Sequence, residues 1–326
     1  MHALIYVWIG SALPDWARVS LGLSKSTSGV QTILLCSRAI GSVPEVSRQY
    51  FLEDFYSPHD FLSARYEHAS AQFRDGFWIK VIERFFILEQ FVRMYGYTNF
   101  FHAELDQLIF NIADLGSKLD EFGFGCFCPR DDINRGIASL IYVNDTGALK
   151  AFTDLALTKI KFDFNDMDLL GELLRHSNKF FSLPTEAVFA SDKANLPFKC
   201  VAQNFTGGIF DAAAIGQFLF GIDRRNCSGR LFNGFENENR GCNLWALKYE
   251  IDLQNGLATI GQRGDSIKTN LYNIHVHSKL FKKIQIKGRI GKIIQQIHVG
   301  KKTLMHLNAD SNSFWRLVLR VAGVQK

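Results

Sequence analysis

Two carboxylates that lie two residues apart are the side chains whose types and spacing most clearly indicate chemistry. Glu104 and Asp106 fall within residues 100–110, a stretch that is otherwise apolar and aromatic. Side chains alternate between the two faces of a strand, so both acids share one face. A buried strand carries such charges only at its end, where a cation or ligand offsets the loss of hydration. The pair therefore predicts a metal site, with Asp106 as the stronger ligand.

A helix and a short turn are expected to position the acidic pair. Apolar residues recur at helical spacing through residues 77–95, which predicts an amphipathic helix against a sheet. A turn at Gly96 and a strand over residues 98–102 follow. Ligands of open α/β sheets bind beyond the carboxyl ends of the strands. The acidic pair is therefore expected where a substrate binds.

The rest of the chain predicts further alternation of helices and strands. Residues 5–9, 15–23 and 30–36 predict a strand, a helix and a strand. Polar residues 37–75 predict a short helix and an irregular loop. The later predictions are a strand at 137–144, helices at 146–159 and 166–177, a short helix within 210–221, a hairpin of 245–252 and 257–261, and a last strand at 271–277.

Length and composition limit the class of protein. With 326 residues and 47% hydrophobic content, the chain can bury the core of one large α/β domain or a domain with an appendage. No uninterrupted apolar run is long enough for a membrane span, and the N-terminus matches a first strand better than a signal peptide, so we expect a cytoplasmic protein. The six cysteines are scattered through a chain too large to need disulfides, so we expect reduced thiols. Cys126 and Cys128 have no second close pair, so no zinc site is expected.

The net charge of +5 is divided unequally along the chain. Residues 282–326 carry ten Lys and Arg and one acid, Asp310, so this tail has +9 and residues 1–281 have −4. Isoleucines recur at helix-like spacing among the basic residues. The tail predicts either an amphipathic segment on an anionic membrane surface or a helix packed on the domain with its basic face solvated. Nucleic-acid binding is not expected, because no basic-aromatic interleaving or reader motif accompanies the charge.

Several segments together resemble the GT-A fold glycosyltransferases, Rossmann-like α/β enzymes that transfer a sugar from a nucleotide donor. Residues 5–16, Ile-Tyr-Val-Trp-Ile-Gly-Ser-Ala-Leu-Pro-Asp-Trp, resemble the start of the DxD sugar transferases. Residues 83–106 resemble glycogenin-like and lipopolysaccharide glycosyltransferases, in which an arginine-bearing helix precedes the acidic strand. Residues 273–279, Asn-Ile-His-Val-His-Ser-Lys, resemble their late His and Lys segment. The motifs HxExD, FDAAAIGQ and HxHSK also resemble a group of bacterial and viral proteins associated with surface carbohydrate.

The resemblance implies a metal-dependent hexosyltransferase with a mixed sheet flanked by helices over residues 1–280, followed by the basic segment 281–326. It implies that Mn²⁺ or Mg²⁺ is held by Asp106, Glu104 and a histidine. His275 and His277 share one face of their strand, and we favour His277 because it lies nearer the strand end. Two departures are that Glu-Leu-Asp replaces DxD, and that the late segment lacks the glycine and the Lys-Pro-Trp ending. Glutamate is also a hard oxygen ligand, so the first departure preserves metal chemistry.

The same resemblance assigns residues to the nucleotide-diphosphate donor. Lys279 and Arg84 are expected at the diphosphate, since an arginine fork suits phosphate oxygens. Gly10 and Ser11, at the end of the first strand, would let backbone amides approach the nucleotide. Trp8 is expected there or in the core. Glu104 can also hold the ribose hydroxyls.

Asp211 and Gln217 are the candidate catalytic residues, because they could face the acceptor or the transferred sugar. The acceptor is expected to be a glycan or a lipid-linked sugar, and the His and Lys segment favours retention of anomeric configuration. Helix capping is the alternative explanation for Asp211, and for Asp166 and Asp168 it is the default.

Each of the other site assignments also has a structural alternative. The acidic pair could be a surface salt-bridge pair, the histidines could lie on a solvated face, and Arg84 could pair with Glu83 or Glu89. For the whole protein, the alternatives are a non-catalytic carbohydrate- or membrane-binding protein of this fold and a nucleotidyltransferase. A nucleotidyltransferase also presents paired carboxylates to a metal-bound diphosphate.

Overall fold

The computed structural model describes residues 2–58, 76–159, 164–189, 205–221, 242–262, 264–279 and 281. The basic tail from residue 282 and much of the loop that was predicted within 37–75 therefore lie outside the described residues. Among the described residues, no helix is both long enough and apolar enough to cross a membrane.

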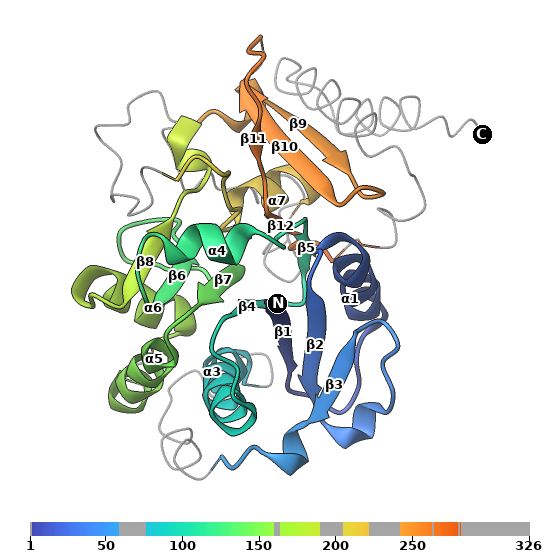
Figure 1. Cartoon of the computed structure of the whole chain (residues 1–326), viewed down its shortest axis with the longest axis vertical. Coiled ribbons are helices and arrows are strands. Elements are labelled where there is room, and N and C mark those ends of the chain that lie inside the picture. Colours follow the sequence, from blue (N-terminus) through green and yellow to red (C-terminus); the bar gives the residue numbers. More distant parts are fainter. Residues whose placement is uncertain are drawn as a thin grey trace, which may run out of the picture.

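A seven-stranded sheet forms the centre of the molecule, in the order β3-β2-β1-β4-β7-β6-β8 (Figure 1). β7 pairs antiparallel with both of its neighbours, whereas the other pairs are parallel. The carboxyl ends of β1, β4 and β6 therefore lie along the same end of the sheet, which is called the carboxyl edge below. The strands are β1 (Ala3–Trp8), β2 (Gln31–Cys36), β3 (Arg48–Phe51), β4 (Phe100–Ala103), β6 (Cys126–Pro129), β7 (Leu140–Val143) and β8 (Phe180–Leu183).

Helices cover both faces of this sheet, because the buried strands present apolar side chains alternately to each side. Ile5 belongs to the core under α3, α5 and α6, whereas Leu4 and Tyr6 belong to the core under α1 and α4. The mixed α/β sheet flanked by helices that we predicted is confirmed. The helices are α1 (Asp15–Thr27), α3 (Phe77–Tyr95), α4 (Leu115–Asp120), α5 (Thr146–Lys159) and α6 (Asp166–His176).

A third core lies at the carboxyl edge, where the last described elements pack together. A separate three-stranded sheet, in the order β11-β10-β9, appears at the top of Figure 1. A two-stranded sheet joins β12 to β5 in antiparallel register. These elements are β5 (Gln107–Ile109), α7 (Ala214–Phe220), β9 (Leu247–Asp252), β10 (Leu257–Gln262), β11 (Thr269–Asn270) and β12 (Asn273–His275), and short 3₁₀ turns span Arg38–Ile40, Leu52–Asp54, Glu186–Phe189 and Leu244–Ala246.

The stretch of residues 100–110 differs from its sequence prediction in one respect that matters for the site. It is two strands, β4 and β5, separated by Glu104, Leu105 and Asp106. Leu105 is buried in the core under α1 and α4, whereas the two acids cluster with His275. The carboxylates therefore stand where the chain leaves the sheet, which avoids placing them inside a fully buried strand.

Candidate active site

The acidic pair lies at the carboxyl edge of the sheet, directly beyond β4. All residues of β4 are buried, whereas the side chains of Glu104 and Asp106 keep 22% and 15% exposure. β5 then carries the chain away from the main sheet to pair with β12. This pairing brings in the residue that completes the cluster.

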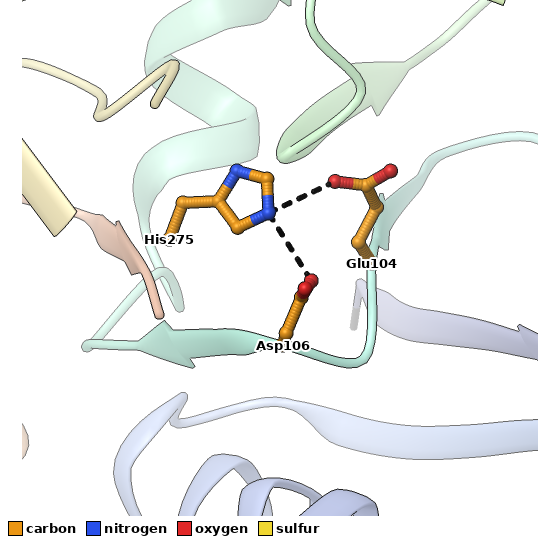
Figure 2. Close-up of side chains that lie close together, drawn as sticks. All are labelled: Glu104, Asp106 and His275. Atoms are coloured by element: carbon orange, nitrogen blue, oxygen red, sulfur yellow. Dashed lines mark ion pairs between the residues drawn. The ribbon is translucent and has the colours of Figure 1, made fainter. Parts of the chain in front are cut away.

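His275 reaches both carboxylates from β12. It stands opposite Gln107 in the β5–β12 register, and the amide of Val276 donates to the carbonyl of Asp106 at 2.7 Å. Its Nε2 lies 3.2 Å from Oδ1 of Asp106 and 3.4 Å from Oε2 of Glu104 (Figure 2). Its Nδ1 lies 3.1 Å from the carbonyl oxygen of Ala212, so Nδ1 carries the proton that this carbonyl accepts.

This donor set fits a divalent cation. Glu104, Asp106 and His275 each offer one ligand atom, and these atoms all lie within 4.8 Å of one another. Two carboxylate oxygens and one imidazole nitrogen suit Mn²⁺, and Mg²⁺ binds through the carboxylates with water. Fixing Nδ1 on a backbone carbonyl directs the lone pair of neutral Nε2 at the metal position, as in characterised metal sites.

The three groups also shift the pKa values of one another. Burial raises the pKa of Asp106, but His275 and Lys279 outweigh burial and hold that pKa below its usual range. Burial lowers the pKa of His275, but Asp106 and then Glu104 outweigh it and raise the pKa to about 9. In the absence of a metal, a proton on Nε2 therefore takes the position between the carboxylates.

Lys279 adds a second positive group beside Asp106. Its Nζ lies 3.3 Å from Oδ2 of Asp106 and 5.3 Å from the centre of the Trp16 ring. Its φ is +55°, a left-handed conformation that no other non-glycine residue of the described chain adopts. Such conformations persist where the surrounding structure enforces them, often at functional sites. Here the amide of Lys279 donates to the carbonyl of Val276 at 2.8 Å, which closes the turn after β12.

The end of β1 reaches the same place through two tryptophans. The rings of Trp8 and Trp16 meet edge to face with centroids 6.4 Å apart, and Nε1 of Trp8 donates to the carbonyl of Ala12 at 2.9 Å. Trp8 is partly buried, whereas Gly10 and Ser11 are exposed. The structure thus brings this predicted nucleotide-contacting segment to the side of the cluster that bears Lys279.

Arg84, which was predicted at the diphosphate, pairs with two carboxylates in the structure. It lies on α3 and is 7% exposed, and its Nη1 donates to Oε1 of Glu104 at 2.8 Å while its Nη2 donates to Oδ2 of Asp166. Burial lowers the pKa of Arg84, but Glu104 and Asp166 outweigh this and raise it. Both terminal nitrogens of the guanidinium therefore bind carboxylates, and one of these carboxylates, Glu104, is a candidate metal ligand. Neither Glu83 nor Glu89 is its partner in these ion pairs.

Asp211 lies under the cluster and is fully buried. Its Oδ1 accepts from the amide of Ile215 at 3.0 Å, and its Oδ2 accepts from the amides of Gly216 at 2.7 Å and His275 at 2.9 Å. Burial raises its pKa to about 6, and the backbone donors act in the opposite direction. The carboxylate therefore joins the start of α7 to β12, which is the capping alternative with an additional bond to His275.

Gln217 and His277 lie beside the cluster. Nε2 of Gln217 is 3.4 Å from Nε2 of His277, and the His277 ring stacks on that of His275 with centroids 3.8 Å apart. His275, not the favoured His277, faces both carboxylates. The reason is that β12 ends at His275, where the amide of Val276 joins Asp106, so the strand end lies two residues earlier than predicted.

Sequence reasoning missed two contributors to the site. Asp166 was assigned only to helix capping, and Trp16 was noted only as part of a motif. A buried arginine on the facing helix could have indicated a second acid, but the sequence offers no sign of which acid lies opposite Arg84.

His102, in β4, is buried, and its Nδ1 lies 2.9 Å from the carbonyl oxygen of Ile5. Burial and then Arg84 lower the pKa of His102 to about 3, so the ring is neutral.

Comparison with known proteins gives weak structural similarities. No family model matches the sequence, and no curated protein matches it. The structure is similar to mouse xyloside xylosyltransferase 1, with a TM-score of 0.37 and 11% identity over 57% of this chain and 86% of that one. It is also similar to the glycosyltransferase GlyE of Streptococcus pneumoniae TIGR4, with a TM-score of 0.36 and 14% identity over 58% of this chain and 46% of that one. The galactosyltransferase LgtC gives a TM-score of 0.36 and 10% identity over 56% of this chain and 74% of that one. Similarities at this level carry no functional argument.

Proposed function

We propose that this chain is a metal-dependent glycosyltransferase that moves a sugar, a hexose or a related sugar, from a nucleotide-diphosphate donor to a glycan or lipid-linked acceptor. The observation that carries the proposal is the convergence of Glu104, Asp106 and His275 within 4.8 Å at the carboxyl edge of the sheet. Lys279 stands beside this cluster, so the site combines hard metal ligands with a cation suited to phosphate.

The chemistry requires stabilisation of a nucleoside diphosphate as it leaves the sugar. A divalent cation such as Mn²⁺ or Mg²⁺, held by Glu104, Asp106 and His275, would neutralise negative charge on the diphosphate. Lys279 would turn its ammonium from Asp106 to a phosphate oxygen, over a distance that the flexible lysine stem allows. Arg84 supports the site indirectly, because it fixes Oε1 of Glu104.

The donor base and ribose are proposed to lie at the end of β1. Trp8 and Trp16 offer aromatic surface beside Lys279, and exposed Gly10 and Ser11 leave their backbone accessible. Aromatic rings stack favourably on nucleobases, which have a π-face irrespective of the base.

The transferred sugar is proposed to lie on the other side of the metal, beside α7. Gln217 has an amide that can orient a sugar hydroxyl, and its neighbour His277 stacks on a metal ligand. Asp211 acts by holding the backbone of His275 and the start of α7. The resemblance of the late His and Lys segment favours retention. Contact of the basic segment 282–326 with an anionic membrane and a cytoplasmic location are proposed from the sequence alone.

The test is donor turnover by the full chain with and without Mn²⁺. A screen of nucleotide sugars for thermal stabilisation first identifies the donor, since a bound ligand raises the melting temperature. We expect Mn²⁺-dependent release of a nucleoside diphosphate, and at least about a 100-fold loss in Asp106→Asn, because the metal loses an anionic ligand. The matched control is Asp154→Asn, which neutralises an exposed acid on α5 and should leave turnover unchanged.

Other products would support other functions. Release of pyrophosphate would identify a nucleotidyltransferase. Binding of a glycan without metal-dependent binding of any nucleotide sugar would identify a non-catalytic carbohydrate-binding protein. Unaltered turnover in Asp106→Asn would exclude the assigned metal role.

A further inference from the structure

A third carboxylate stands behind the candidate metal ligands. Asp166 is the first residue of α6 and is 3% exposed. Its Oδ2 accepts from Nη2 of Arg84, and the other terminal nitrogen of that guanidinium, Nη1, donates to Oε1 of Glu104 at 2.8 Å. One buried guanidinium is therefore shared between two carboxylates that belong to different elements.

Helix capping does not explain why Asp166 is buried. The side chain of Asn165 accepts from the amides of Met167 at 2.9 Å and Asp168 at 3.0 Å, and the side chain of Asp168 accepts from the amide of Asn165 at 3.2 Å. This capping box satisfies the start of α6. Burial raises the pKa of Asp166, and Arg84 opposes that shift, so the arginine is what supports its charge.

The orientation of Glu104 follows from the two carboxylates that bind the Arg84 guanidinium. A guanidinium commonly binds one carboxylate through two parallel hydrogen bonds, which would engage both oxygens of Glu104. Because Asp166 holds Nη2, Arg84 takes only Oε1, and Oε2 remains 3.4 Å from Nε2 of His275. We propose that Asp166 is a positioning residue that acts through Arg84 to keep Oε2 of Glu104 turned toward the metal position. This role rests on the proposed metal centre.

The test is the affinity of the full chain for Mn²⁺ alone, measured by the electron paramagnetic resonance signal of free Mn²⁺ on variants that melt cooperatively. We expect Asp166→Ala to weaken Mn²⁺ binding about 10–100-fold, the range for residues that orient a metal ligand. Asp166→Asn keeps an oxygen acceptor for Nη2 but loses its charge, so it should weaken Mn²⁺ binding about two- to tenfold, and it serves if Asp166→Ala does not fold.

The matched control is Asp168→Ala. It removes the same charge from the same turn of α6, but Asp168 bonds the cap residue rather than Arg84. This variant should melt at a lower temperature and bind Mn²⁺ as the wild type does. An equal loss of affinity in Asp168→Ala and Asp166→Ala would overturn the proposal, because it would indicate a general charge effect.

A double variant tests the route through Arg84. In an Arg84→Gln background, Asp166→Asn should change the Mn²⁺ affinity little further, because the connecting guanidinium is absent; additive losses would overturn the proposal. Unchanged affinity in folded Asp166→Ala, or in Asp166→Asn where only that variant folds, would refute the positioning role and leave the metal centre intact. A wild-type chain that binds no Mn²⁺ would refute the metal centre and the positioning role together.

Discussion

Gly216 controls how closely α7 approaches the strand that carries His275, and its replacement should disable the site. A Cβ added at Gly216 would overlap the carbonyl oxygen of His275, and it would lie 2.5 Å from the carbonyl carbon and 2.9 Å from Oδ2 of Asp211. Optimal carbon contacts lie at about 3.5–4.0 Å, so β12 and α7 must separate by about 1 Å or more in Gly216→Ala. A 1 Å displacement of catalytic groups can reduce turnover by about 100-fold.

The variant should also lose stability, because the atoms of His275 that the added Cβ meets are backbone atoms and cannot swing aside. Overpacking costs about 1–3 kcal/mol, and alanine recovers at most about 1 kcal/mol over glycine within a helix. We therefore expect Gly216→Ala to remain folded, with a net loss of about 2–3 kcal/mol in urea unfolding, while Mn²⁺ affinity and donor turnover fall about 100-fold. These are measured by electron paramagnetic resonance and by nucleoside diphosphate release.

Gly221, just beyond the end of the same helix, provides the control. It has a φ of +84°, and among the described residues no atom lies within 4 Å of an added Cβ, so Gly221→Ala strains the backbone without moving His275. We expect a loss of about 1–3 kcal/mol of stability and unchanged Mn²⁺ affinity. If Gly216→Ala kept wild-type Mn²⁺ affinity and turnover, the dependence of the site on the contact between α7 and β12 would be refuted.

Three further predictions concern charge and burial. In steady-state kinetics, Lys279→Met should raise the donor KM about 10–100-fold, because a hydrogen bond to a charged group contributes about 1.5–3 kcal/mol. Lys279→Arg should recover part of this affinity, and an unchanged KM in the methionine variant would exclude contact with the diphosphate. Arg84→Met should lower the free energy of unfolding in urea by about 3–5 kcal/mol, because it leaves the carboxylates of Glu104 and Asp166 without their ion-pair partner. A loss of less than about 1 kcal/mol would show that the shared ion pair is not formed. Burial raises the pKa of Cys126 to about 12, so in the native protein at pH 8 this thiol should resist iodoacetamide. Mass spectrometry should detect labelling of Cys126 only in concentrated urea, and rapid labelling of the native protein would contradict its burial.

The sequence predicted the elements whose patterns are long and local. The helical spacing over residues 77–95 coincides with α3, and residues 146–159 coincide with α5. β6 and β8 were missed because each has four residues and gains its stability from pairing with neighbouring strands, which no local pattern records. β5 was merged with β4, because periodicity does not reveal where a chain leaves a sheet.

The site was predictable where residue type alone is informative. Glu104 and Asp106 stand out because carboxylates seldom interrupt an apolar strand, and the His and Lys segment carries the resemblance. The choice between His275 and His277 depends on the pairing of β12 with β5, across more than 160 residues, and could not be made locally. Asp166 was equally hidden, because acids at helix starts are ordinarily caps, and only the packing of α6 against α3 joins it to Arg84.

The central claim is that Glu104, Asp106 and His275 bind the metal that holds a nucleotide diphosphate. It is tested most directly by anomalous diffraction from crystals of the chain soaked with Mn²⁺ and a nucleoside diphosphate. We expect one Mn²⁺ peak within ligand distance of Oε2 of Glu104, Oδ1 of Asp106 and Nε2 of His275, with the diphosphate between the metal and Lys279. A nucleotide bound elsewhere, or a diphosphate at this edge with no Mn²⁺ among these three side chains, would contradict it.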